Sequence, residues 1–297
     1  MPLHAAWLKG NLHTHTNQSD GDSSPAAVAA WYANHGYDFL VLTDHDKVTR
    51  VENAPLLLIP GEEVTDRLEK KPLHVNAIGI DDPVAPQHGK TKVENLQRNV
   101  DAIVKRGAIA LVNHPNFGWA FGADELLQLE NVTLLEIASG HQFVNAQGPP
   151  SVESMWDQLL TKGRRVWGVA VDDMHHLNDP LGVESVPPGR AWVCVRSEKR
   201  DAASILDALR RGDFYASTGP ELEEYSASNQ SIAVKVRERY GARYRIQFIG
   251  SGGQMLQESQ GLTATYAIRG NEPYVRAKVI DSNGKAAWLQ PWFVSKK

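Results

Sequence analysis

Nine polar side chains lie in or just after successive apolar runs of the sequence, where they could share metal ions. They are His13, His15, Asp20, His45, Glu63, His74, His114, Asp173 and His175. Imidazole and carboxylate donors without a thiolate suit Zn²⁺, Mn²⁺ or Fe²⁺ better than a structural thiolate zinc site. Nine donors exceed the roughly four to six that one such ion takes. The sequence therefore predicts a centre of two or three divalent ions with shared ligands.

The spacing of the donors supports a common site. Successive side chains of a strand point to opposite faces, so His13 and His15 face the same way, as do Asp173 and His175. The turn "SDGDSS" can fold Asp20 back toward the first pair. Each residue also has an ordinary interpretation, as a hydrogen-bonded core histidine, a solvated loop acid or part of a polar surface loop. We favour the metal centre because those ordinary roles would have to coincide at the ends of successive strands.

The apolar runs that carry these donors alternate with amphipathic stretches from about residue 7 to 220. Helices are predicted at 25–35, 93–106, 151–162 and 200–211. Repeated strand–helix alternation predicts parallel pairing with the helices outside. A closed or nearly closed β/α barrel is one arrangement, and an open doubly wound sheet is the other. In a barrel, the carboxyl ends of the strands converge on one face, which is where the donors fall.

The pattern changes after "STGP" at residues 217–220. Segments such as "SIAVKVRERY" and "YVRAKVID" alternate apolar and polar residues and are separated by glycine, asparagine and serine turns. This is typical of a small antiparallel β domain. The chain is therefore predicted to divide into residues 1–222, which carry the donors, and a C-terminal β domain at 223–297.

Composition excludes several classes of protein. A formal charge of −4 gives no reason to expect nucleic acid as a partner, and no apolar run approaches the ~20 residues needed to cross a membrane. The N-terminus lacks a basic leader followed by an apolar core, so we expect a cytoplasmic protein. The single cysteine, Cys194 in "AWVCVR", is interpreted as a buried packing residue. No Gly-x-Gly-x-x-Gly or Gly-x-Ser-x-Gly motif is present, and the oligomeric state is not indicated.

Six motifs in order, "HTHTNQSDG", "LTDHD", "GEEVT", "HVNAIG", "VNHPN" and "VDDMHH", resemble the PHP (polymerase and histidinol phosphatase) family of metal-dependent hydrolases. The later "ALRRGDFYASTGP" resembles its carbaryl-hydrolase-like branch. The resemblance covers residues 10 to about 220. It implies a distorted (β/α)₇ barrel with a trinuclear metal centre, followed here by the small antiparallel β domain.

The resemblance also assigns the donors to three ions. It implies one ion held by His13, His15, Glu63 and Asp173. Glu63 would bridge to a second ion, whose other ligands are His74 and His114. The third would take Asp20, His45 and His175, with Asp20 standing where many members have histidine.

Two choices of register follow from the family pattern. Glu63 is chosen over Glu62 because the acid lies two residues after a glycine. Asp173 is chosen over Asp172 because the pattern is Asp-x-His.

The predicted activity is hydrolysis of a small phosphorylated metabolite by a hydroxide that bridges two metals. One alternative is a carbamate, carboxylic ester or amide hydrolase that uses the same centre. Trp119 and Phe121 would then form an apolar wall for the substrate, or would simply cap the barrel. The other alternative is a non-catalytic, metal-stabilised module whose β domain binds a partner or a glycan.

Four further residues are candidates for roles around the metals. His141 and His176 each lie next to a strand end and could serve as the general acid, or could be solvated loop histidines. Lys47 and Arg190 lie in loops on or near the predicted face and could bind the substrate's anion, or could be ordinary surface charges.

Overall fold

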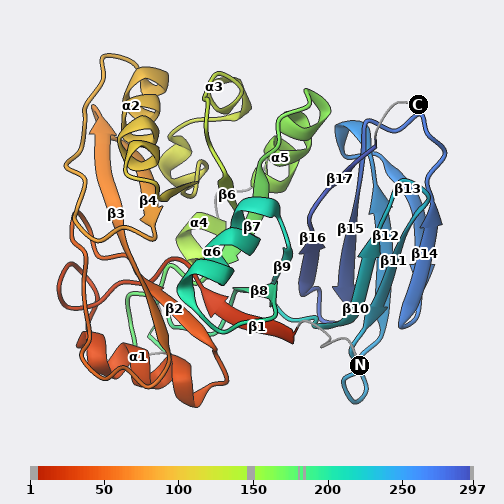
Figure 1. Ribbon diagram of the computed structural model, residues 1–297, viewed down its shortest axis with the longest axis horizontal. Helices are drawn as coiled ribbons and strands as arrows, with labels where there is room; N and C mark the ends of the chain where they lie inside the picture. Colours follow the sequence, from red (N-terminus) through yellow and green to blue (C-terminus); the bar gives the residue numbers. More distant parts are fainter. Residues whose placement is uncertain (1–5, 146–150, 180, 183–184, 295–297) are drawn as a thin grey trace.

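The structure, a computed structural model, describes residues 6–145, 151–179, 181–182 and 185–294. It is a mixed α/β fold built on one long sheet, and the α-helices of the described residues lie between residues 25 and 211 (Figure 1). No helix in the described part of the chain is long and apolar enough to span a membrane.

The four longer helices begin and end close to the predicted residues. They are α1 (Pro25–Asn34), α2 (Lys92–Lys105), α5 (Val152–Thr161) and α6 (Ala202–Arg211). Each follows a polar N-cap whose side chain accepts a backbone N–H of the first turn, as Thr91 does from Glu94 at 3.1 Å. Gly212, with φ +77°, ends α6 in the left-handed region that favours glycine. Two short helices, α3 (Ala123–Leu126) and α4 (Gln142–Asn145), lie between strands.

Nine strands of the N-terminal part lie side by side. They are β1 (Ala6–Asn11), β2 (Phe39–Leu42), β3 (Leu57–Leu68), β4 (Lys71–Ile78), β5 (Ile109–Val112), β6 (Leu134–Ser139), β7 (Trp167–Val171), β8 (Trp192–Ser197) and β9 (Phe214–Ser217). Their order in the sheet is β9-β8-β1-β2-β3-β4-β5-β6-β7. The pairs β1–β2, β2–β3, β5–β6 and β6–β7 are parallel, as predicted.

The prediction of parallel pairing is wrong for β4 and β8. The pairs β3–β4, β4–β5, β1–β8 and β8–β9 are antiparallel. Only Glu69 and Lys70 separate β3 from β4, and so short a link permits a hairpin but no crossover. In the described strands no ladder closes the sheet between β7 and β1, although a single bridge joins Thr14 to Met174 just beyond their ends. The distorted (β/α)₇ barrel therefore stays a prediction.

The antiparallel pairing predicted for the C-terminal strands is confirmed. A three-stranded sheet contains β10 (Leu222–Ala227), β11 (Ser231–Val236) and β14 (Thr263–Ala267). The strands β12 (Tyr244–Ile249), β13 (Met255–Gln260), β15 (Tyr274–Asp281) and β16 (Ala286–Leu289) extend the long sheet, and β17 (Trp292–Phe293) pairs with β15. Because β16 pairs with β9, these strands continue the sheet that carries the donors. The predicted boundary after residue 222 falls inside β10.

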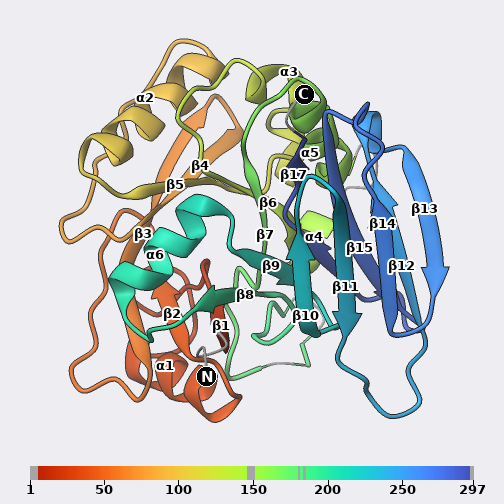
Figure 2. The same cartoon turned by 45° about the vertical axis from the view of Figure 1, so that its right-hand side comes forward.

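A buried ion-pair network fastens the C-terminal strands to α5, beside which they lie in Figure 2. The Arg276 guanidinium on β15 donates to Asp157 at 2.7 and 2.8 Å and to Glu153 at 2.9 Å. Arg276 is 1% exposed. A buried charge with matched partners fixes the position of the two elements that it joins. The division into two domains stays a prediction.

The back of β3 and β4 is covered by α2. Val64 of β3 lies in one fully buried cluster with Leu96, Val100 and Ile103 of the helix. Burying each such side chain contributes roughly 1.5–3 kcal/mol. This packing fixes the position of β3 against α2, and the opposite face of the strand carries Glu63.

Candidate metal centre

The structure brings all nine predicted donors together. They form four overlapping groups in which the donor atoms lie within 4.8 Å of one another: His15–Asp20–His45–His175, His13–Glu63–His114, His13–His15–Asp173 and His45–Glu63–His74. The extended chain beyond β1 and β7 carries donors to this face, because the Thr14–Met174 bridge sets His13 and His15 beside Asp173 and His175. A second bridge, between His45 and Glu63, brings in the segment beyond β2.

The deepest donors converge as the ligands of one ion would. The Nε2 atoms of His13 and His15 are 3.2 Å apart. The Oδ1 atom of Asp173 lies 3.1 and 3.2 Å from them, and the Oε2 atom of Glu63 lies 3.4 and 3.3 Å from them. Ligand atoms that surround one ion tetrahedrally at ~2.1 Å are about 3.4 Å apart. His13, His15 and Asp173 therefore fit a common divalent ion, and Oε2 of Glu63 lies at ligand spacing from the same two imidazoles.

Glu63 faces histidines with both oxygens of its carboxylate. Its Oε2 atom lies 3.1 Å from Nδ1 of His45, in addition to the two contacts with His13 and His15. Its Oε1 atom lies 3.0 Å from His74 and 3.5 Å from His114. A carboxylate whose oxygens point to different groups of donors fits a ligand that bridges two ions.

The neighbouring acids point away, which agrees with the two choices of register. Glu62 accepts the backbone N–H of Val84 on the other face of β3. Asp172 accepts the Tyr32 hydroxyl at 2.7 Å and the backbone N–H groups of residues 189–191. Asp173, with φ +50°, turns the chain so that its own carboxylate faces the histidines.

The third group of donors is more open. The Oδ2 atom of Asp20 lies 3.2 Å from Nε2 of His45 and 3.4 Å from Nε2 of His175. The side chain of Asp20 is 52% exposed, that of His45 26% and that of His175 16%, whereas His13 and Glu63 are at most 1% exposed. The centre therefore has a buried interior and an outer position that faces solvent. We call the position formed by Asp20, His45 and His175, with His15 behind them, the outer position.

Electrostatics keep the carboxylates ionised. Burial by itself would raise the pKa of Glu63, but His13 and His74 hold it well below its ordinary value. At Asp173, too, burial alone would raise the pKa, but His13 and His15 hold it well below its ordinary value. Contact with Asp20 outweighs burial at His175 and raises its pKa to about 9. Two buried anions surrounded by imidazoles form a donor set suited to divalent cations.

Several supporting residues had no place in the sequence prediction. Glu136 of β6 is 1% exposed, and its Oε2 atom lies 3.2 Å from Nδ1 of His13, which turns Nε2 of that ring toward the other donors. The Asn113 amide donates to Glu63 at 2.7 Å, and Thr65 contacts Nδ1 of His45 at 2.5 Å. The only sequence signal for Glu136 is a lone acid in the apolar run "LLEIAS".

The two candidate acids lie at the edge of the centre. The ring of His141 is 5.7 Å from that of His175, and burial lowers its pKa to about 4. The ring of His176 is 6.3 Å from that of His175, and its Nδ1 atom accepts the backbone N–H of Val186 at 3.1 Å. Neither is a member of the four donor groups.

The two candidate anion-binding residues are exposed. Lys47 donates to the side chain of Gln18 at 2.6 Å, in the loop that also carries Asp20. The backbone N–H of Arg190 donates at 2.7 Å to Asp172, the residue before Asp173.

The two aromatic residues considered for a substrate wall or a cap of the barrel, Trp119 and Phe121, lie in different surroundings. Phe121 is 5% exposed and belongs to the hydrophobic core, which fits the capping alternative rather than a substrate wall. Phe117 instead lies with its ring 5.4 Å from His114 and 5.9 Å from His141. Trp119 is 43% exposed.

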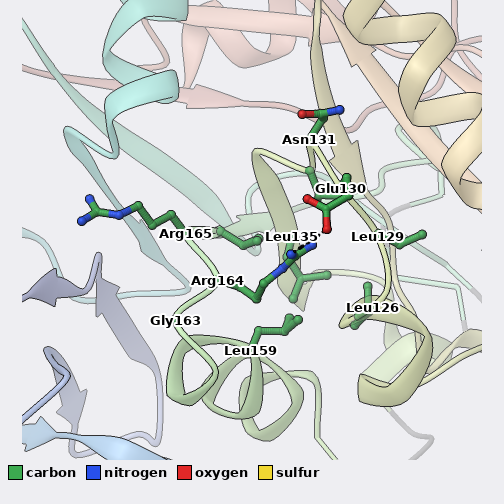
Figure 3. A pocket seen from close by; sticks show the side chains of 11 residues that line it. Leu126, Leu129, Glu130, Asn131, Leu135, Leu159, Gly163, Arg164 and Arg165 are labelled. Carbon is green, nitrogen blue, oxygen red and sulfur yellow. Dashed lines mark hydrogen bonds and ion pairs between the residues drawn. The ribbon is translucent and has the colours of Figure 1, made fainter.

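A separate hollow of about 270 Å³ lies between α3, α5 and the start of β6 (Figure 3). Its floor is apolar, with Leu126, Leu135 and Leu159, and Arg164 and Glu130 pair across it at 2.9 Å. None of the nine donors lines it.

No protein-family model matches this sequence, and comparison with curated proteins finds no match. Among solved structures, an amidohydrolase from Chromobacterium violaceum with bound sulfate and no metal is 17% identical; the match covers 60% of this chain and 92% of that one, with a TM-score of 0.44. A two-domain protein from Bacteroides vulgatus, described as containing a predicted PHP-like metal-dependent phosphoesterase, is 18% identical and matches with a TM-score of 0.55. That match covers 97% of this chain and 96% of the other. Over nearly its whole length, the chain is therefore similar in fold to that two-domain protein.

Proposed function

We propose that this protein is a metal-dependent hydrolase of the PHP type, in the carbaryl-hydrolase-like branch, that cleaves a phosphoester of a small metabolite. The observation that carries the proposal is the convergence of six histidines and three carboxylates, with Glu63 in contact with five of the histidines. The similarity in fold to the Bacteroides vulgatus protein, whose description includes a PHP-like metal-dependent phosphoesterase, supports it. A distorted (β/α)₇ barrel at 1–222 and a β domain at 223–297 are part of the proposal.

The assignment of up to three ions follows the family resemblance, and the proximity of the donors supports it. His13, His15, Glu63 and Asp173 would hold the first ion. Glu63 would be shared with the second, together with His74 and His114. Asp20, His45 and His175 would hold the third. Bound Zn²⁺, Mn²⁺ or Fe²⁺ would supply Lewis acidity toward phosphoryl oxygens and lower the pKa of water.

The chain's own residues would orient the substrate and move protons. His176 accepts the Val186 amide at Nδ1, so the neutral ring carries its hydrogen on Nε2 and can donate it to a leaving group. His141, at the edge of the same face, is the other candidate for this role. Lys47 and Arg190 are the candidate cations for the substrate's anion.

The alternative is a carbamate or carboxylic ester hydrolase with the same centre. The observation that favours it is Phe117, whose ring lies against both His114 and His141 and offers an apolar contact to a substrate. No anion-binding cation is needed for such a substrate.

The test compares p-nitrophenyl phosphate with an aryl carbamate, using protein loaded in turn with Mn²⁺ and Zn²⁺. We expect turnover of the phosphoester, and loss of that turnover with a chelator or in His114→Ala. His35→Ala is the matched control, because His35 is an exposed histidine that bonds Trp31 at the end of α1. Turnover of the carbamate alone would overturn the phosphoesterase assignment. Full activity after complete metal removal would overturn the metal-dependent mechanism, and metal binding without any hydrolysis would favour the non-catalytic module.

A further inference from the structure

Three segments carry the outer position, those of Asp20, His45 and His175, and one aspartate joins the first of them to the last. Asp20 lies in the loop between β1 and α1, and His175 lies in the chain that follows β7. Of the hydrogen bonds described between residues 17–24 and 175–178, four involve Asp22. Asp22 is exposed and is itself too far along its loop to belong to any donor group.

The bonds of Asp22 use both its backbone and its side chain. Its N–H donates to the carbonyl of His175 at 2.8 Å. Its carboxylate accepts the backbone N–H groups of Leu177 at 2.9 Å and of Asn178 at 3.0 Å. The Asn178 amide returns a bond to the carbonyl of Asp22 at 3.0 Å. A carboxylate that accepts two backbone N–H groups holds them in a fixed geometry, because charge-assisted hydrogen bonds are stronger than neutral ones.

The loop that carries Asp20 is rigid on its own side. Gly21 donates to the carbonyl of Thr16 at 2.9 Å, and Asn17 donates to that of Ser23 at 2.8 Å. A Cβ atom at Gly21 would lie 2.9 Å from backbone atoms of the 15–16 segment, so the turn admits no side chain there. Because this loop is rigid, holding Asp22 in place also holds Asp20, which lies two residues earlier.

We propose that Asp22 is a positioning residue that clasps the two loops together and thereby sets the affinity of the outer position for a divalent cation. The inference rests on the metal centre of the proposed function. It concerns the outer position alone, because the interior donors lie on strands β3 and β4 or just beyond the ends of β1, β5 and β7. Without the clasp, the 3.4 Å contact between Asp20 and His175 relies on the backbone bond to Met174 from His15, which lies five residues before Asp20. Loss of this preorganisation weakens the binding of a divalent cation at the outer position.

The experiment titrates the full-length, chelator-stripped protein with Mn²⁺ by calorimetry and counts bound metal by elemental analysis. Wild-type protein is expected to bind one Mn²⁺ equivalent at the outer position more weakly than the Mn²⁺ bound by the interior donors. Asp20→Ala is expected to lose this outer equivalent. Asp22→Asn puts an NH₂ group in the place of one acceptor oxygen, where it faces a backbone N–H, so that hydrogen bond is lost. It is expected to weaken the outer equivalent about tenfold or more, which corresponds to ~1.4 kcal/mol, while interior binding is unchanged. Asn178→Ala removes one bond and should weaken the same equivalent less.

Asp81→Asn is the matched control, since Asp81 is 83% exposed and pairs with Arg50 away from the donor groups. Melting of the metal-free variants verifies that each is folded; should Asp22→Asn fail to fold, Asn178→Ala decides. An unchanged outer equivalent, or equal weakening of all equivalents, overturns the clasp. Absence of the weaker equivalent from wild-type protein also overturns it. Wild-type protein that binds all equivalents but hydrolyses no phosphoester overturns the proposed function and leaves the clasp standing.

Discussion

The two faces of β3 carry neighbouring acids with opposite surroundings. Glu63 faces the histidines of the metal centre, and Glu62 faces the segment around Val84 under α2. Both are buried, with exposures of 1% and 0%. Burial raises the pKa of Glu62 to about 7, whereas at Glu63 the facing histidines override burial and hold the pKa well below its ordinary value. Partners, rather than burial alone, decide whether a carboxylate here is poised to bind a cation.

A third acid on the back face has a structural role. Asp66 accepts the backbone N–H and the ring nitrogen of His88, both at 2.9 Å, and the amide of Asn99 at 3.1 Å. These hydrogen bonds, led by that of Asn99, overcome the effect of burial and lower its pKa to about 2. Glu62 and Asp66 together fasten the segment 84–88 to the strand. One strand thus carries a candidate metal ligand on one face and anchors for a loop on the other.

The largest expected difference between the faces is in metal binding. Glu63→Gln removes the charge of the shared donor, so we expect loss of bound metal and of hydrolysis. Glu62→Gln is the control next to it in the chain, and we expect it to keep its metal content. Elemental analysis of both purified variants measures the outcome. Equal metal loss in the two variants would contradict the assignment of the faces.

A smaller difference is expected in stability at Asp66. Its folded pKa of about 2 lies below the unfolded value of ~3.9, so the carboxylate stabilises the fold above about pH 4. That contribution is lost as the pH falls through about 2. Asp66→Asn should lower the free energy of unfolding by about 1–3 kcal/mol near neutral pH, and the deficit should shrink in acid.

Urea unfolding of the metal-free protein at several pH values measures this deficit. Asp207→Asn, which removes a surface pair with Arg211, is the control and should cost less than ~0.5 kcal/mol. A deficit at Asp66 that is constant with pH would contradict the role given to its charge.

The smallest effect is expected at Glu62, with the opposite sign. Its folded pKa of about 7 lies above the unfolded value of ~4.3, so stability falls as the pH rises between these two values. Glu62→Gln carries no such charge. The free energy of unfolding of Glu62→Gln minus that of wild type should be larger at about pH 8 than at about pH 4, by on the order of 1–2 kcal/mol. Thermal melts at the two pH values test this, and the reverse order would refute it.

Local patterns in the sequence predicted much of the molecule. The four longer helices follow from capping residues and apolar spacing, and the structure confirms them within two residues at each end. Alternation along the strands separates Glu63 from Glu62 and Asp173 from Asp172, and in both cases the predicted residue is the one that faces the histidines. These features depend on periods of two or 3.6 residues, which a short window of sequence contains.

Pairing between distant segments could not be predicted in the same way. The antiparallel placement of β8 against β1 joins residues that are more than 180 positions apart. The contact of Glu136 with His13 spans 123 positions, and the clasp at Asp22 spans 155. A lone acid in an apolar run has the same sequence pattern whether or not it supports a site. The same is true of a polar turn.

The sequence by itself determined which side chains could bind metal, on which strand faces they lie and where the longer helices begin. Only the tertiary structure decided that nine donors meet, that they divide into a buried interior and an open outer position, and that the C-terminal strands continue the same sheet through β9 and β16. The physical reason is that periodicity is local, whereas the meeting of strand ends depends on long-range pairing whose free energy comes from burying whole faces together.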